Sequence, residues 1–350
     1  MIKAKVIGAT GYGGIGIIEL LLGHPQAQIV RLDSINDIGT PISALYPHLQ
    51  GLCDLPIANV KQPDETPVDV VFMATPDGVG MQLAGAQLQQ GARVIDYSGD
   101  FRFHNSTAYA DYATRIGRDP AHAAPELLPQ SVYGLAELHR EDLRGARLVG
   151  NPGCFAVSCI LGLAPAVRNN LVGLDRLICD CKTGISGAGK KTAPTFHYPA
   201  RYENMNAYKL AGHQHVCEIE HELSAVAGAP ASVTFTAQAV PMCRGIMSTL
   251  YGALCAGVKP DDVLAAYREF YKDCAFVRLY GPADQVGTVH VRGSNFCNLV
   301  VDVDRRTDTL RVVAYIDNLM KGQAGSALQN MNLICGLPET TGLMQPGRYP

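Results

Sequence analysis

The sequence predicts an α/β fold in which a doubly wound parallel sheet is followed by an α+β domain with a mostly antiparallel sheet. Three observations predict it. Short apolar strands alternate with helices over about the first 150 residues, as they do in parallel sheets. A glycine-rich turn connects the first of these strands to the first helix. Beyond Pro152 the candidate strands become longer, which indicates a change of architecture.

The first part opens with an apolar strand at residues 3–7 and a helix at about 14–22, which Gly23-His24-Pro25 stops. A second strand follows at 28–32. Two more short apolar runs have the length and composition of buried strands and flank a helical stretch. These strands are expected at 68–74 and 93–96, with the helix at about 78–89.

The second part starts with a helix at about 153–163, and its strands are expected at 177–182, 232–242, 246–255, 296–303 and 309–316. From the pattern alone, a final helix at about 318–335 could belong to either domain. The uncharged stretch 148–167 contains Asn151, Pro152 and Pro165, which suits a strand, loop and helix better than a membrane span. We therefore expect no membrane partner.

Composition narrows the class of protein. The chain has 350 residues, 47% of them hydrophobic, and a formal net charge of −3, which suggests two globular domains rather than a disordered chain. Lys and Arg total 29 against 32 acidic residues, no basic tract occurs and Trp is absent, so no nucleic-acid partner is expected. The 11 cysteines follow no repeated spacing, which favours reduced thiols and a cytoplasmic location.

The glycine turn has the spacing Gly8-x-x-Gly11-x-x-Gly14 between a strand and a helix. Glycines let the backbone approach a pyrophosphate, and the start of the helix supplies N–H groups and a positive dipole end. Asp33 follows the second strand, where an acid can bind a ribose 2′-hydroxyl. This pattern predicts a Rossmann-type dinucleotide site. A tight turn without a ligand is the alternative.

The loop from Gly184 to Lys191 resembles a phosphate-binding loop but lacks one essential residue. Lys191 stands where a nucleotide triphosphatase needs a Ser or Thr hydroxyl to hold magnesium. The small residues and two ammonium groups favour binding of an anionic substrate group. A solvated loop without a ligand is the alternative.

Cys154 is the candidate nucleophile. It follows Gly150-Asn151-Pro152-Gly153 and occupies the first turn of an apolar helix, where the helix dipole favours a thiolate. Asn151 and the neighbouring N–H groups could stabilise an oxyanion on an attacked carbonyl. In the absence of these neighbours, a buried inert thiol would be the better interpretation.

A dense group of ionisable residues at 212–223 is the candidate acid–base site. If a helix starts near His215, then His215, Glu218 and Glu222 share one face. A carboxylate beside a histidine suits general acid–base catalysis. A metal site made by His213, His215 and Cys217 would lack a known zinc pattern, so no metal is expected. An exposed polar helix is the other alternative.

Taken together, the motifs resemble the N-acetyl-γ-glutamyl-phosphate reductase family of arginine biosynthesis. The resemblance runs in order along nearly the whole chain. Its blocks are GATGYGG (8–14), DYSGDFRF (96–103), VYGLAEL (132–138), GNPGC (150–154), KTGISGAGKK (182–191), AYKLAGHQH (207–215), VPMCRGIMST (240–249), GSNFCN (293–298) and the segment 316–343.

The resemblance implies a dinucleotide-binding domain at 1–150, completed by a C-terminal helix at about 318–350, and a catalytic, substrate and oligomerisation domain at 151–317. It implies NADPH-dependent reduction of an acyl phosphate to a semialdehyde through a Cys154 thioester. One of His213 and His215 would move the proton, with a slight preference for His213. The small-molecule partners would be the acyl phosphate and phosphate, and the assembly a homodimer or homotetramer.

Motifs and resemblance together assign residues to the two ligands. The cofactor is expected at Gly8, Thr10, Gly11, Tyr12, Gly13, Gly14, Asp33, Ser34, Thr75, Ser186, Gly187 and Asn318. The substrate is expected at Arg102, Lys182, Ser186, Lys190, Glu218 and Arg244. All of these except Glu218 are candidates for holding its carboxylate and phosphate.

One departure from the family concerns the cofactor. Members that use NADPH usually carry an arginine soon after the second strand, whereas residues 33–37 here contain two acids and no arginine. Asp33 would repel a 2′-phosphate unless Arg31 or Ser34 compensates. We therefore expect relaxed or NADH-leaning use of NADPH/NADP and NADH.

Three other functions remain open at this stage. The first is a sister reductase acting on aspartyl or aminoadipyl phosphate. The second is a nucleotide-sensing protein that has lost catalysis, in which Cys154 would be dispensable. The third is a cysteine acyl hydrolase, which would consume no nicotinamide cofactor.

Overall fold

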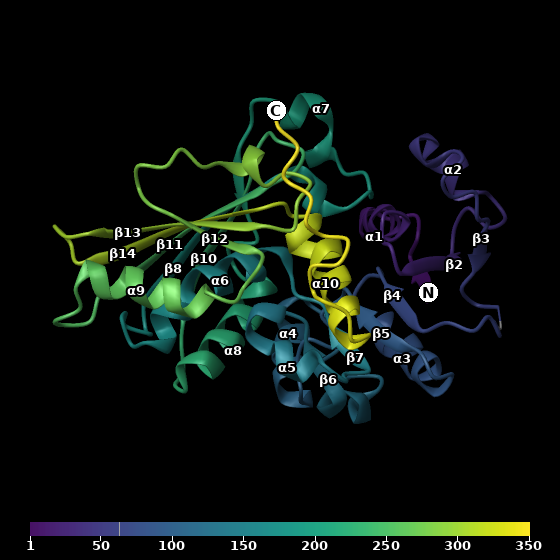
Figure 1. Ribbon diagram of the computed structural model, residues 1–350, viewed down its shortest axis with the longest axis horizontal. Coiled ribbons are helices and arrows are strands. Elements are labelled where there is room, and N and C mark those ends of the chain that lie inside the picture. Colours follow the sequence, from purple (N-terminus) through teal and green to yellow (C-terminus); the bar gives the residue numbers. More distant parts are fainter. Residues whose placement is uncertain (63) are drawn as a thin grey trace. The chain divides into compact units, whose positions relative to one another are not determined.

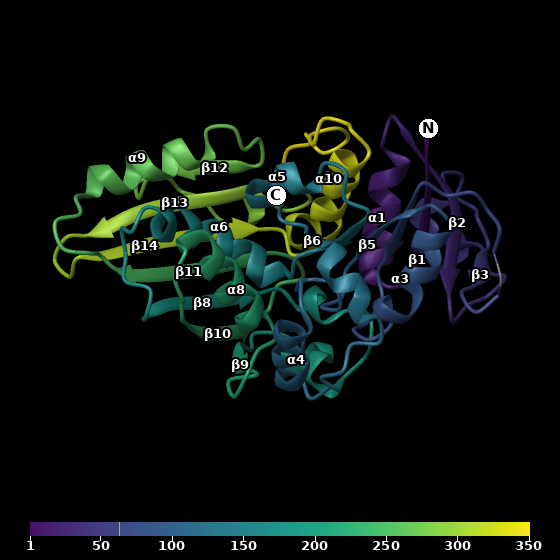
Figure 2. The same ribbon diagram turned by 90° about the horizontal axis from the view of Figure 1, so that it is seen from below.

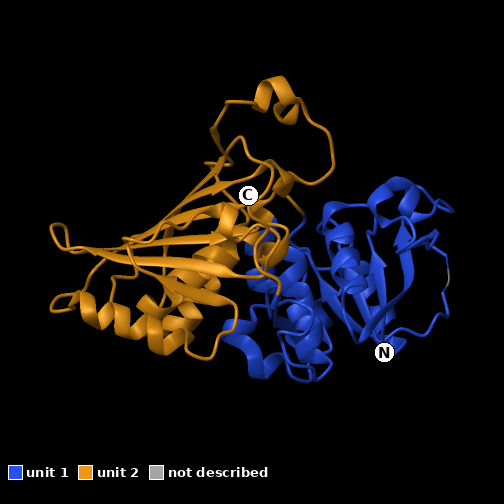
Figure 3. Cartoon of the chain, turned by 45° about the horizontal axis from the view of Figure 1, so that its top comes forward, with its two compact units in different colours: residues 1–113, 119–152, 323–344 blue, residues 114–118, 153–322, 345–350 orange. Residues whose placement is uncertain are grey.

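The computed structural model describes residues 1–62 and 64–350, which form two compact units (Figure 3). Each unit contains one seven-stranded sheet. The first unit comprises Met1–Ala113, Asp119–Pro152 and Gln323–Met344, and the second comprises Thr114–Arg118, Gly153–Gly322 and Gln345–Pro350. Residues 318–322 and 345–350, expected in the first domain, therefore belong to the second unit.

The sheet of the first unit is entirely parallel and confirms the doubly wound architecture (Figure 1). Its strand order is β3-β2-β1-β4-β5-β7-β6. The chain winds outward in both directions from β1 and β4, and ligands of such sheets bind at this switch point. The strands are β1 (Ile2–Ile7), β2 (Ala27–Ser34), β3 (Ile57–Asn59), β4 (Val70–Met73), β5 (Arg93–Asp96), β6 (Ser131–Tyr133) and β7 (Leu148–Gly150).

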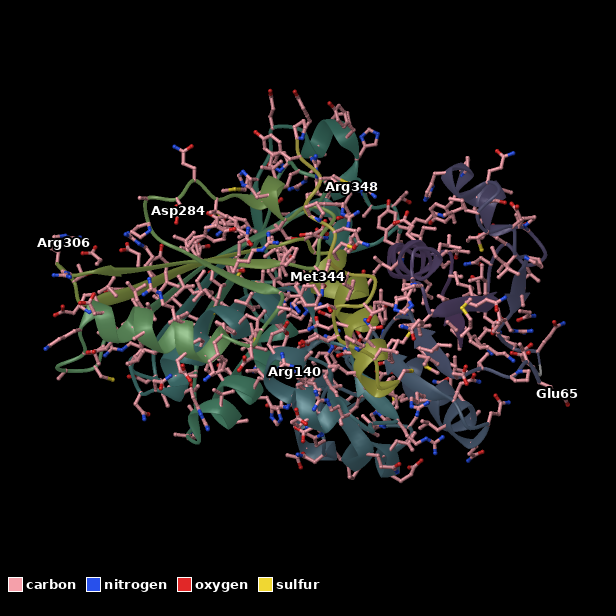
Figure 4. The ribbon with its side chains drawn as sticks, viewed as in Figure 1. Glu65, Arg140, Asp284, Arg306, Met344 and Arg348 are labelled. Carbon is pink, nitrogen blue, oxygen red and sulfur yellow. The ribbon has the colours of Figure 1, made fainter. Side chains whose placement is uncertain are left out.

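The C-terminal helix α10 lies beside α1 and α5 inside the first unit (Figure 2). All ten of its residues are buried, including Asn330 and Asn332, whose amides bond to neighbouring backbone carbonyls. Beyond α10, Glu339 pairs with Arg140 of α5 at 2.9 Å (Figure 4 labels Arg140). The helices of this unit are α1 (Tyr12–Leu22), α2 (Ile42–Leu45), α3 (Gly80–Gln89), α4 (Ser106–Arg115, ending in the second unit), α5 (Ala136–Leu143) and α10 (Gly325–Ile334).

The helix expected at 318–335 is confirmed in its extent, since residues 320–334 are helical, but its first turn differs from a regular α-helix. The structure has a π-helical turn at Met320–Ala324, and only then does α10 begin. Asp317 explains the change, because its carboxylate accepts the N–H groups of Leu319 and Met320 and its carbonyl accepts that of Gly322. These bonds replace those that a regular helix would make at its start.

The sheet of the second unit is mixed, with four antiparallel and two parallel pairs, which confirms the mostly antiparallel expectation. Its order is β12-β13-β14-β11-β8-β10-β9. Arg306, labelled in Figure 4, lies at the tip of the β13–β14 hairpin. The strands are β8 (Leu177–Thr183), β9 (Asn206–Tyr208), β10 (Val233–Ala239), β11 (Ile246–Ala253), β12 (Val277–Tyr280), β13 (Cys297–Asp304) and β14 (Thr309–Ile316).

Helices α6, α8 and α9 pack on one face of this sheet (Figures 1 and 2). Helix α6 is the central one, and 13 of its 15 residues are buried. Alternation along β8 buries Cys179, Cys181 and Thr183 on one side and leaves Ile178, Asp180 and Lys182 more exposed on the other. The helices are α6 (Cys154–Arg168), α7 (Tyr198–Arg201), α8 (His215–Ala227) and α9 (Pro260–Tyr271).

The glycine turn after β1 uses its three glycines differently. Gly8 has φ +82°, and a Cβ there would lie 2.3 Å from the carbonyl oxygen of Ala74. A Cβ at Gly14 would lie 2.2 Å from the carbonyl oxygen of Gly8. At Gly11 the nearest atom would be 3.6 Å away. Gly8 and Gly14 are therefore required by the fold, whereas a Cβ at Gly11 would make only an ordinary van der Waals contact.

We expect Gly14→Ala to lower the free energy of unfolding by about 2 kcal/mol or more, because the clash is with backbone that cannot rotate away. Gly11→Ala is the matched control and should cost less than about 1 kcal/mol. Urea denaturation of the two variants measures the difference. Equal losses of stability would contradict this account of the turn.

Candidate active site

Cys154 begins α6, and two groups from α8 lie against the backbone just before it. The amide of Gly153 donates a hydrogen bond to Oε1 of Glu218 at 2.7 Å. A Cβ on Gly153 would lie 2.3 Å from Nε2 of His215 and 2.9 Å from Oε2 of Glu218. The imidazole and the carboxylate are therefore close to each other and to the start of the helix that carries the thiol.

Gly322 closes another side of Cys154. It belongs to the π-helical turn, and a Cβ there would lie only 2.7 Å from Cβ of Cys154. The backbone of Gly322 therefore packs directly on Cys154, and a side chain at position 322 would collide with the cysteine.

A cavity of about 320 Å³ lies within the second unit and has Cys154 in its lining. His213 and His215 also line it, together with residues of the 3₁₀ turn Ile185–Ala188. A later segment supplies more of the wall, including Arg201, Tyr208 and Lys209. The structure thus brings the predicted nucleophile and both predicted histidines to one cavity of a size typical for small-molecule ligands.

His213 is packed among aromatic rings. The ring centroids of Phe235, Phe155 and Tyr208 lie 4.9, 5.7 and 5.8 Å from its own. Burial, with smaller contributions from the charges of His215 and Lys209, lowers the pKa of His213 to about 2. Its Nδ1 accepts the backbone N–H of His215 at 3.2 Å. His213 is therefore a neutral imidazole whose proton resides on Nε2.

Tyr208 remains a protonated phenol in this cavity. Burial, followed by the charges of Cys154 and Cys181, raises the pKa of Tyr208. It can donate a hydrogen bond to a ligand but cannot act as a base near neutral pH.

Two of the predicted anion-binding residues are paired with acids of the second unit. Lys182 forms an ion pair with Asp180 on the side of β8 opposite Thr183, which lines the cavity. Nε of Arg244 lies 3.0 Å from a carboxylate oxygen of Asp317. Neither Lys182 nor Arg244 is among the described residues that line the cavity.

The loop that resembles a phosphate site is held by its own hydrogen bonds. The hydroxyl of Ser186 donates to the carbonyl of Cys243 at 2.6 Å and accepts from the amide of Asn318 at 2.9 Å. Oδ1 of Asn318 accepts the N–H of Gly245 at 2.7 Å. Gly187 lines the cavity, and Lys190 is exposed. Ser186 and Asn318 therefore shape the loop from beneath.

Asn151 and Arg102 are engaged within the first unit. The side-chain amide of Asn151 donates to the carbonyl of Gln323 at 3.0 Å, and its oxygen accepts from Asn330 at 3.1 Å. Arg102 is buried and donates to the carbonyls of Asn151 and Tyr97 at 2.8 and 2.7 Å. Both side chains therefore stabilise the first unit through these hydrogen bonds, whatever their role toward a ligand.

Asp33 is 1% exposed and its charge is compensated. Its carboxylate lies 3.0 Å from Nζ of Lys5 and 2.8 Å from Nε of Arg31. Asp64 approaches the same two cations at 3.0 Å each. Burial opposes ionisation of Asp64, but hydrogen bonds from Thr66 and Lys5 lower its pKa to about 2. The four groups form a network of two cations and two anions.

Other predicted cofactor residues surround the glycine turn. Oγ1 of Thr10 lies 3.3 Å from Oγ of Ser34. Tyr12 and Gly13 start α1, whose first turn has no acidic residue and no capping bond from any described side chain. The buried hydroxyl of Thr75, just after β4, has no hydrogen-bond partner among residues 1–62 and 64–350. These features leave polar groups at the switch point available to a ligand.

Sequence reasoning missed Arg201, Tyr208, Lys209 and Gly322. The block at 207–215 contains Tyr208 and Lys209, but its strongest chemical signal is the pair of histidines. Arg201 follows no motif, so no local signal marked it. Gly322 matters only because the π-helical turn brings it to Cys154, which requires the tertiary structure.

In the part of the chain that the structure describes, no cluster of three or more His, Cys, Asp or Glu side chains could hold a metal ion. Among the same residues, no helix has both the length and the apolar character needed to cross a bilayer.

Comparison with known proteins first defines the class. A family model described as the NAD binding domain of semialdehyde dehydrogenases matches residues 3–146, and one described as their dimerisation domain matches residues 154–318. Both parts of the chain therefore belong to the semialdehyde dehydrogenases.

Full-length relatives then define the family. The N-acetyl-gamma-glutamyl-phosphate reductase of Geobacter sp. (strain M21) is 41% identical over 98% of each chain. That of Symbiobacterium thermophilum is 43% identical over 100% of this chain and 99% of the relative. The chain belongs to the N-acetyl-γ-glutamyl-phosphate reductase family.

Solved structures of more distant proteins share the fold. Aspartate semialdehyde dehydrogenase II from Vibrio cholerae has a TM-score of 0.71 at 17% identity, covering 95% of this chain and 98% of its own. Aspartate semialdehyde dehydrogenase with NADP from Candida albicans has a TM-score of 0.66 at the same identity and coverage. At this identity the likeness concerns the fold alone.

The neutral state of His213 predicts a pH dependence of stability. Its folded pKa of about 2 lies below the usual unfolded value of about 6.5, so the unfolded chain binds the proton more readily. Stability should therefore fall as the pH drops below about 6.5, by about 2 kcal/mol at pH 5 from this group.

Urea denaturation at pH 7.5 and pH 5 measures this dependence. His213→Gln should reduce the loss between the two pH values by about that amount, whereas the exposed control His197→Gln should not. An unchanged loss in His213→Gln would show that the imidazole titrates normally in the folded protein.

Proposed function

We propose that this chain reduces N-acetyl-γ-glutamyl phosphate to N-acetylglutamate semialdehyde with NADPH and releases phosphate, as a step of arginine biosynthesis. The observation that carries the proposal is the cavity that Cys154 shares with two histidines. The names of the full-length relatives support the substrate. The first unit would bind the dinucleotide, and the second would carry catalysis and self-association.

In the first step, the thiolate of Cys154 attacks the acyl carbon, a C–S bond forms and the C–O bond to phosphate breaks. The bound nicotinamide supplies the hydride that reduces the resulting thioester. The product then leaves when the C–S bond breaks and the thiolate is restored. The N-terminal end of α6 favours the anionic sulfur in both the first and the last step.

We assign to His215 the role of general acid and base, which supplies and removes the proton during the reaction. Its Nε2 lies against Gly153, next to the carboxylate of Glu218, which can orient the ring and stabilise an imidazolium. His213 stays neutral and can offer its Nε2–H as a fixed hydrogen-bond donor. This assignment reverses the slight preference for His213 that the sequence suggested.

The first unit fits a dinucleotide. Gly11 has no side chain at the start of α1, and no described side chain caps that helix. Thr75 adds a buried hydroxyl that has no partner within the described residues. A pyrophosphate needs this combination of close backbone approach and available N–H and O–H donors.

The network around Asp33 supports relaxed use of NADPH and NADH. Asp33 is paired with Lys5 and Arg31, so it does not present an isolated negative charge to a 2′-phosphate. It is also buried, so it is a poor partner for a ribose hydroxyl. Asp33 should therefore not repel the 2′-phosphate of NADPH, and it should not bind the ribose 2′-hydroxyl of NADH either.

We propose that the assembly is a homodimer or homotetramer formed through the second unit. The matching family model is described as a dimerisation domain. The sheet face opposite α6, α8 and α9 carries half-buried side chains of β11 and β14, together with Ile178 at 43% exposure. Sedimentation equilibrium would contradict this assembly if the chain remained a monomer at micromolar concentration.

The function is tested in the reverse direction, from N-acetylglutamate semialdehyde and phosphate, by the absorbance of reduced nicotinamide. Cys154→Ala should lower kcat at least about 1,000-fold, and His215→Asn should lower it more than His213→Asn does. Cys255→Ala, at an exposed cysteine, is the matched control and should keep full activity.

Activity that survives in Cys154→Ala would rule out the thioester route. A wild-type protein that is inactive with this aldehyde but active with aspartate semialdehyde would identify the sister reductase instead. Phosphate release from the acyl phosphate without consumption of NADPH or NADH would identify a hydrolase.

The cofactor proposal predicts that wild-type kcat/KM for NADPH exceeds that for NADH by less than 100-fold, which corresponds to about 2.7 kcal/mol. Arg31→Ala removes one of the two cations from Asp33 and should lower kcat/KM for NADPH about 10-fold more than for NADH. Lys61→Ala removes an exposed charge that does not pair with Asp33 and should leave the ratio unchanged. A wild-type preference of 100-fold or more would contradict relaxed use.

A further inference from the structure

Two cations in the wall of the cavity have no role in the proposed chemistry. Arg201 ends α7, and Lys209 follows β9. Both belong to one segment of the second unit, residues 195–209, which we call the excursion. Both line the cavity that contains Cys154. We infer that Lys209, supported by Arg201, binds the carboxylate at the non-reacting end of the substrate. The inference rests on the proposed function and specifies its substrate as an acyl phosphate that retains a free carboxylate.

Arg201 is a buried cation whose partners are all neutral. It is 5% exposed, and its guanidinium donates to the carbonyls of Thr195, Asn204 and Ala239 at 3.4, 3.3 and 3.1 Å. A fourth bond reaches Oδ1 of Asn206. No carboxylate of the described residues pairs with it. A buried charge without a counterion favours an anion in the adjacent space.

Those four bonds also hold the excursion together. They use four of the five N–H groups of the guanidinium and connect residues 195–206 to the end of β10. Arg201 is therefore a positioning residue that fixes the segment leading to Lys209 and contributes positive charge to the cavity.

Lys209 has a backbone and a side chain that are both constrained. Its φ of +49° is in the left-handed region, which is uncommon for residues other than glycine and concentrates at functional sites. Its ammonium donates to Oε1 of Gln214 at 2.6 Å, and Gln214 also lines the cavity. Within the described residues, Lys209 has no acidic partner. Two further N–H donors of the ammonium remain for a ligand.

The position of Lys209 favours the carboxylate over the phosphate. Phosphate is bonded to the carbon that Cys154 attacks, so it must leave beside the buried start of α6. Lys209 is an exposed residue at the edge of the cavity, whereas His213 and His215 are buried. In a glutamyl substrate the carboxylate is separated from the attacked carbon by several carbon atoms. The reacting end therefore belongs near Cys154 and the charged end near Lys209.

The reverse reaction separates the two anions, because the semialdehyde carries the carboxylate and phosphate is a second substrate. Lys209→Met should raise KM for N-acetylglutamate semialdehyde about 10- to 100-fold and change KM for phosphate less than twofold. Lys209→Arg should restore part of the affinity, since it retains the charge. Lys272→Met, at an exposed lysine of the same unit, is the control and should behave as wild type.

A second aldehyde makes the test independent of folding. 4-Acetamidobutanal has the same aldehyde and amide but no carboxylate, so wild type and Lys209→Met should turn it over with equal kcat/KM. A raised KM for phosphate, or an unchanged KM for the semialdehyde, would overturn the inference. A wild-type protein inactive with the semialdehyde would instead overturn the proposed function, and the inference with it.

Discussion

The hydrogen bond between the amide of Gly153 and the carboxylate of Glu218 is the contact on which the arrangement of the site depends. It is charge-assisted and buried, and it joins the start of α6 to the first turn of α8. Because α6 begins with Cys154 and α8 begins with His215, one bond sets the distance between thiol and imidazole. Loss of the carboxylate would leave a buried N–H without its acceptor, although α6 and α8 would still pack against each other.

Each unit contains an irregular stretch of backbone directly after a strand, one after β1 and the other after β14. In the first, Gly8 and Gly14 allow the chain to turn sharply from β1 into α1, where the amide of Gly8 donates to the carbonyl of Asp33. In the second, Asp317 organises the end of β14, since its carboxylate accepts two backbone N–H groups of the following turn and pairs with Arg244. In both places an irregular backbone is stabilised by specific bonds rather than by apolar packing.

Much of the fold could be predicted from the sequence, and the failures have physical causes. The strands at 93–96 and 309–316 were predicted with the bounds observed, because turn residues delimit short apolar runs there. The helix expected at 318–335 is present at 320–334, but its π-helical first turn was not predicted, because apolar periodicity does not reveal the bonds that Asp317 makes there. Other expected elements differ by a few residues at their ends, where caps decide the boundary.

The site was predictable only where chemistry and local structure coincide. Cys154 could be found because a glycine-rich turn and an apolar helix mark it in one stretch of sequence. Lys182 and Arg244 were chosen for their charge, but acids on neighbouring elements pair with them, and such pairing depends on register and tertiary contacts. Lys209 lacks a local signal, because its left-handed backbone and its place in the cavity wall become visible only in the folded chain.

The packing of Gly322 on Cys154 has a consequence for reagents that modify the thiol. Backbone occupies one side of the cysteine, and the cavity of about 320 Å³ lies on another, so an electrophile can reach the thiol from the cavity but not from the side of Gly322. Reactivity toward alkylating agents should then depend on their shape as much as on their intrinsic chemistry. Slender electrophiles should therefore react faster than bulky ones.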